Sequence, residues 1–79
     1  MSQYQNIYAQ KIYDIMAAYI GDIMSKGALR AQCKILGISE ESIEAHNIPL
    51  LAEKLRKGLI IFVGSEGANQ IATQIIQMY

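Results

Sequence analysis

The sequence predicts an all-α fold, a compact bundle of four to five short helices around a long N-terminal helix. Apolar residues recur at helical spacing through the 79-residue chain, and no two segments alternate in a way that would supply paired strands. Two apolar helical patterns also stop at a glycine, Gly37 and Gly64, the usual residue just past a helix end. Ser39 and Ser65 follow them as helix-capping residues. We expect a single helical domain over residues 1–79.

The first helix is expected over about residues 3–24 and should end near Ser25 to Gly27. At 100° per residue its apolar side chains cover roughly 260° of the helix, whereas a helix packed on one side needs a stripe of about 100°. This helix is therefore predicted to be covered on more than one side.

Four shorter helices should follow, over residues 28–36, 39–45, 48–63 and 66–78. Gly37 separates the first two, and Pro49 lies in the first turn of the third, where its missing N–H costs nothing. Spacing predicts which side chains face inward. They are Leu29, Cys33, Leu36, Ile43, Ile48, Leu51, Ala52, Leu55, Leu59, Phe62, Val63, Ala68, Ile71, Ala72, Ile75 and Ile76.

The composition indicates hidden apolar surface. Apolar residues make up 52% and charged residues 18% of the chain, against about 45–50% and 25% in ordinary soluble domains. This balance favours an oligomer. Seven Lys and Arg against seven Asp and Glu give no net charge, so a nucleic-acid partner is not expected. No apolar run approaches the ~20 residues of a membrane span, and no signal peptide is recognisable, so we expect a cytoplasmic protein.

The sequence offers no catalytic, cofactor-binding or metal-binding set, and we therefore predict a protein that is not an enzyme. Cys33 and His46 are the only Cys and His, two short of the four ligands of a structural zinc site. Cys33 lies on an apolar helical face, where an inert buried thiol is usual. The later glycines lack the Lys-Ser/Thr that follows a phosphate-binding glycine loop.

The alternative function is a small DNA-binding regulator, because residues 28–47 resemble a helix-turn-helix motif with Gly37 in the turn. Its second helix would enter the major groove. That helix carries Glu40, Glu41 and Glu44 and no Lys or Arg, so phosphates would repel it.

The leading hypothesis is a protein–protein interaction module of the signalling or regulatory scaffold type, which self-associates as a homodimer through the first helix or binds another protein. Four side chains of that helix, Tyr4, Tyr8, Ile15 and Tyr19, fall within about 60° of one another. We call them the tyrosine edge. Tyrosine is enriched at interfaces because its ring gives contact area while its hydroxyl stays hydrated.

A second partner patch is predicted on the helix over residues 48–63, where Leu50 and Ile61 lie off the inward face beside Lys54 and Lys57. We call these four residues the lysine patch. An apolar pair flanked by lysines suits an acidic amphipathic segment or a membrane surface. A third hypothesis is a carrier of a small apolar ligand, with a pocket lined by the residues Met16, Ile20, Leu55 and Phe62.

Overall fold

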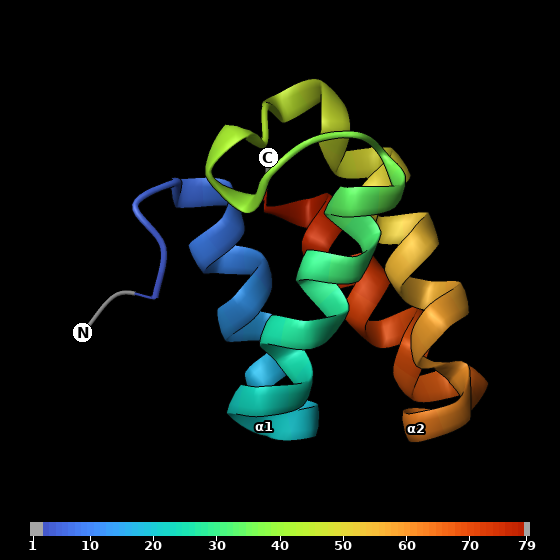
Figure 1. Ribbon diagram of the computed structural model, residues 1–79. Helices are drawn as coiled ribbons and strands as arrows, with labels where there is room; N and C mark the ends of the chain where they lie inside the picture. Colours follow the sequence, from blue (N-terminus) through green and yellow to red (C-terminus); the bar gives the residue numbers. More distant parts are fainter. Residues whose placement is uncertain (1–2, 79) are drawn as a thin grey trace.

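The computed structural model describes residues 3–78 and shows an all-α helical hairpin, with no strand in that part of the chain (Figure 1). Two long helical elements, α1 (Ile7–Ile35) and α2 (Ile48–Gln77), pack against each other. Between them lie two single 3-10 turns, η1 (Glu40–Ser42) and η2 (Ala45–Asn47). The all-α prediction is confirmed. The predicted bundle of short helices around a long N-terminal helix is wrong, because within residues 3–78 the α-helix forms two elements of 29 and 30 residues.

Each long element bends sharply at one glycine. Gly21 has φ 81° and ψ 179°, and Gly64 has φ 76° and ψ 169°, a backbone region that is essentially restricted to glycine. A straight helix of this length would measure about 43 Å, whereas the largest extent of the molecule is 29 Å. Each element is therefore folded into a first and a second limb. The limbs cover residues 7–20 and 22–35 in α1, and residues 48–63 and 65–77 in α2.

The limbs give the hairpin its shape. The second limb of α1 leads into the connection and the first limb of α2 leaves it in the opposite direction, so the two run antiparallel (Figure 1). Both glycine corners lie at the end of the molecule that is opposite the connection (Figure 1).

The predicted first helix is wrong at both ends. It begins at Ile7 and turns at Gly21, and the break expected near Gly27 does not occur, because Gly27 lies inside the second limb of α1. Of the apolar residues that form the 260° arc, Ile23 and Met24 lie beyond the Gly21 corner, on the second limb of α1. The short helix predicted over residues 39–45 is also absent, since only the turns η1 and η2 form there.

The helix end predicted at Gly37 is confirmed, with a φ of 77°, whereas the stop predicted at Gly64 is a corner inside α2, with a φ of 76°. At Gly37 the N–H of Ile38 donates to the carbonyl of Cys33 at 3.0 Å, and that of Gly37 donates to Lys34 at 3.0 Å. These two bonds define a Schellman motif, which satisfies carbonyls that the helix end would leave free. The motif ends α1 and starts the connection.

Polar side chains fasten the start of α1 to the connection. The Asn6 Oδ1 accepts from the N–H of Ala9 at 3.0 Å and caps the helix. Its Nδ2 donates to the carbonyl of Ile43 at 2.9 Å, and the Glu41 carboxylate accepts from the N–H of Asn6 at 2.8 Å. The chain segments at residues 6 and 41–43 are thereby held together.

The core lies between the limbs and is drawn from all four of them, with Ile43 of the connection added. Most residues predicted to face inward are buried. Phe62 and Ile76 are exceptions, because they are 59% and 49% exposed. The main buried residues are Ala9, Ile12, Met16, Leu29, Cys33, Ile43, Ile48, Leu51, Ala52, Leu55, Leu59, Ala68, Ile71, Ala72 and Ile75.

Candidate functional site

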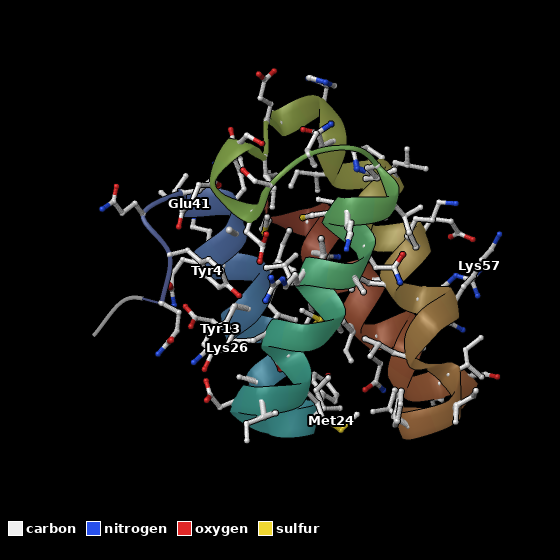
Figure 2. The ribbon with its side chains drawn as sticks, viewed as in Figure 1. Tyr4, Tyr13, Met24, Lys26, Glu41 and Lys57 are labelled. Carbon is white, nitrogen blue, oxygen red and sulfur yellow. The ribbon has the colours of Figure 1, made fainter. Side chains whose placement is uncertain are left out.

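An apolar groove of about 350 Å³ lies between the second limb of α1 and the first limb of α2. None of its lining residues is charged. Met24 marks the end of the groove near the glycine corners, between the two elements (Figure 2). The lining residues are Met24, Gly27, Ala28, Ala31, Gln32, Leu55, Gly58, Leu59 and Phe62.

The groove exists because small residues meet where the two limbs pack. Gly27 and Ala31 lie one helical turn apart on α1, and Gly58 faces them from α2. A Cβ at Gly27 would have no neighbour within 4 Å, whereas one at Gly58 would come within 3.3 Å of the Gln32 amide nitrogen. The missing side chains leave a hollow whose floor, formed by Leu55 and Leu59, is buried.

Exposed apolar side chains continue the groove toward both of its ends. Met24 and Phe62 line it and are 39% and 59% exposed. Ile61, next to Phe62, is 89% exposed. One turn beyond Ala31 lies Ile35, which is 65% exposed. Exposed apolar side chains beside a groove are typical of a binding site.

The charged residues three or four positions from Gly27, Ala31 and Gly58 are all basic, namely Arg30 and Lys34 on α1 and Lys54 on α2. Lys34 lies one turn beyond Ala31 on α1, and Lys54 lies one turn before Gly58 on α2. Lys57 follows on the outer side of α2, 67% exposed and 3.9 Å from the Glu53 carboxylate (Figure 2). Among residues 3–78 no carboxylate lies within 4.0 Å of the Lys34 or Lys54 ammonium.

The lysine patch predicted from the sequence lies on α2 beside this groove, and none of its four residues lines the groove. Leu50 and Ile61 are 49% and 89% exposed, and Lys54 and Lys57 lie between them on the same helix face. The groove itself was not predicted from the sequence. The available signal was the set of small residues in α1 at helical spacing, Gly27 and Ala31.

The tyrosine edge is mostly turned to the molecule's own core. Tyr4, Tyr8 and Ile15 are half-buried and pack against it, and the Tyr4 ring meets the Tyr13 ring edge-on with centroids 5.9 Å apart. Burial raises the pKa of the Tyr4 hydroxyl, with a smaller contribution from Glu40. Only Tyr19 is exposed, at 40%, and its hydroxyl accepts from the Gln74 side chain at 2.9 Å.

The predicted ligand-pocket residues are separated. Leu55 and Phe62 line the groove, whereas Met16 is fully buried in the core and Ile20 is half-buried against it. A groove of about 350 Å³ is at the small end of ligand pockets, which span ~300–1,000 Å³. Its size suits a few inserted side chains better than a large ligand.

The chemically reactive residues lie apart from the groove. Cys33 is fully buried, and burial, with a smaller effect of Glu40, raises the pKa of its thiol to about 11. His46 is exposed, with its Nδ1 3.2 Å from the Glu44 carboxylate. Within residues 3–78, no three His, Cys, Asp or Glu side chains gather as a metal site would require.

No described helix combines the length and apolar character needed to cross a membrane. Comparison of the chain with protein-family models, with curated proteins and with solved structures finds no match. The groove and its surroundings are therefore the features from which a function is proposed.

Proposed function

We propose that the protein is a non-enzymatic protein-interaction module whose groove binds an amphipathic helix of a partner protein. The observation that carries the proposal is the groove between α1 and α2, which is uncharged throughout and continuous with exposed Met24 and Phe62. An amphipathic helix inserts its apolar side chains into such grooves at helical spacing. The apolar face of the partner helix covers the apolar surface that these two limbs leave exposed.

The first test uses a designed helical peptide of about 18 residues, with leucines on one face and glutamine and serine on the other. Methyl NMR of Ala28, Ala31 and Met24 reports whether the peptide enters the groove. We expect shifts concentrated at these methyl groups. Shifts that map elsewhere, or no binding, would contradict the proposal.

Gly27→Leu provides a variant that blocks the groove without harming the fold. Gly27 is helical and open space surrounds the position, so a side chain there fills the groove and removes a helix-weakening glycine. We expect loss of peptide binding with equal or higher stability. Ala18→Leu, an equally exposed site on the first limb of α1, is the matched control and should bind as the native chain does.

Self-association through the tyrosine edge remains a prediction, supported by the exposed Tyr19. Sedimentation equilibrium of the native chain and of Tyr19→Lys tests it, because a lysine there would weaken a dimer that buries this ring. If Tyr19→Lys leaves a dimer intact, the tyrosine edge is not the dimer interface. The Gly27→Leu variant then tests whether the groove is the dimer contact.

A further inference from the structure

We infer that the helix received by the groove is acidic, with Asp or Glu on both sides of its apolar stripe. This inference rests on the proposed function and adds the charge of the partner. Lys34 and Lys54 stand on opposite edges of the uncharged groove, one on each element. A helix lying between them brings the residues that flank its apolar stripe close to both ammonium groups. Complementary charge at such edges sets orientation and the choice of partner.

Three of the seven carboxylates of the chain are engaged away from the groove, and among residues 3–78 none lies within 4.0 Å of the Lys34 or Lys54 ammonium. Asp22 accepts from the Tyr13 hydroxyl and pairs with Lys26, and Glu41 binds the start of α1. Glu53 pairs with Arg56, which holds the pKa of that carboxyl below its usual range. Lys57 is partly neutralised by Glu53, so Lys34 and Lys54 carry the inference.

A second copy of this chain fits the groove poorly. A two-fold dimer would place the same surface on both sides, so the lysines of one groove would approach those of the other. Such like-charge pairs oppose association. The positive edges therefore favour a different, acidic chain over self-docking at this face.

A membrane surface also fits less well than a helix. The groove is recessed, and its floor residues Leu55 and Leu59 are only 1% and 2% exposed. A flat bilayer reaches protruding side chains, whereas a helix inserts side chains between the two limbs. The chain has no net charge, which also weakens attraction to anionic lipid.

The test compares two peptides that share the leucine face described above. One carries glutamates on both flanks of that face and the other carries lysines. We expect the acidic peptide to bind about tenfold more tightly, because two or three exposed ion pairs replace as many repulsions. Raising the ionic strength should remove most of this difference.

Charge reversal on the protein identifies which residues select the peptide. Lys34→Glu with Lys54→Glu should invert the preference, so that the lysine peptide binds more tightly. Lys11→Glu, at an exposed position on the first limb of α1, is the matched control and should leave the preference unchanged. If Lys11→Glu changes the peptide preference as much as the double reversal does, Lys34 and Lys54 are not the residues that select the acidic peptide.

The remaining outcomes separate failure of the inference from failure of the proposed function. Equal binding of both peptides at the groove methyl groups would overturn the acidic partner and leave the helix-binding function intact. Binding of neither peptide would overturn both. Phosphatidylserine-containing vesicles that bind the native chain but not the double reversal, without acidic-peptide binding, would replace the helix with a membrane surface.

Discussion

The two glycine corners have nearly the same backbone but are held by different side chains. Gly21 and Gly64 differ by only 5° in φ and 10° in ψ. The α1 corner is closed by polar contacts, since Tyr13 on the first limb donates to Asp22 on the second. In a straight helix these residues would lie about 13 Å apart. Lys26 completes the set, 3.3 Å from Asp22 (Figure 2).

The α2 corner is closed by tight apolar packing. A Cβ at Gly67 on the second limb would lie 3.0 Å from the Cβ of Val63, just before the corner. No side-chain hydrogen bond within residues 3–78 joins the two limbs of α2. The comparison shows that one backbone geometry can be secured by either chemistry. The corners therefore share the glycine and its backbone conformation, and different residues secure them.

The largest expected loss of stability follows from replacing the glycine at either corner. Gly21→Ala and Gly64→Ala should each lower the free energy of unfolding by about 1–3 kcal/mol, because an L-residue is strained at these angles. Nothing lies within 4 Å of a Cβ at either site, so the loss is conformational. Urea denaturation measures it.

Two controls isolate the backbone cause. Gly27→Ala, inside a helix and in open space, should raise stability by about 0.5–1 kcal/mol. A D-alanine at position 21 or 64 accepts positive φ and should be tolerated. An L-alanine at either corner that costs nothing would show that the chain does not need this bend.

A smaller effect should distinguish the α2 corner. Gly67→Ala should destabilise the chain by about 1 kcal/mol, because the crowding against Val63 outweighs the usual gain from replacing a helical glycine. The Cβ of Val63 is fixed to the backbone and cannot rotate away. A stability gain like that of Gly27→Ala, measured in the same urea series, would show that the corner is loosely packed.

The smallest effect should distinguish the α1 corner and depend on pH. The bond to Asp22 raises the pKa of Tyr13 from 10.0 to about 12, and the same bond lowers the pKa of Asp22 below 3.8. The Tyr13 contribution is therefore complete below pH 10.0 and is lost as the pH rises through about 12. The Asp22 contribution is present above pH 3.8 and is lost as the pH falls through its lowered pKa.

Tyr13→Phe should lower stability modestly at neutral pH. It should also reduce the loss of stability at both the acidic and the alkaline end of the pH range. Denaturation of the two proteins across the pH range measures the difference, in which the titration of other residues cancels. Identical pH dependence of the native chain and the variant would mean that Tyr13 and Asp22 do not interact in solution.

Local rules predicted part of the fold. Glycine conformation predicts the helix end at Gly37 and the break at Gly64. Helical periodicity predicts the buried face of α2 from Ile48 to Leu59. The corner at Gly21 was not predicted, because Ile20 and Ile23 continue the apolar helical pattern across it. Gly27, beside Ser25, offered an equally good stop.

The site was predicted less well because it depends on how limbs distant in sequence pack. The lysine patch is visible in one helix, but the groove beside it needs Gly27 and Ala31 of α1 opposite Gly58 of α2. The exposure of Phe62 has the same origin. Periodicity places it near the inward face, yet the hollow left by the small residues exposes 59% of it.

Because Cys33 is buried, chemical labelling of its thiol reports local opening of the protein. Its thiol is fully enclosed and its pKa is raised to about 11, so a thiol reagent must wait until the second limb of α1 separates from the core. With only one cysteine in the chain, every labelling event records that separation. The labelling rate then gives the rate or the free energy of opening, depending on whether reclosing is slower or faster than reaction.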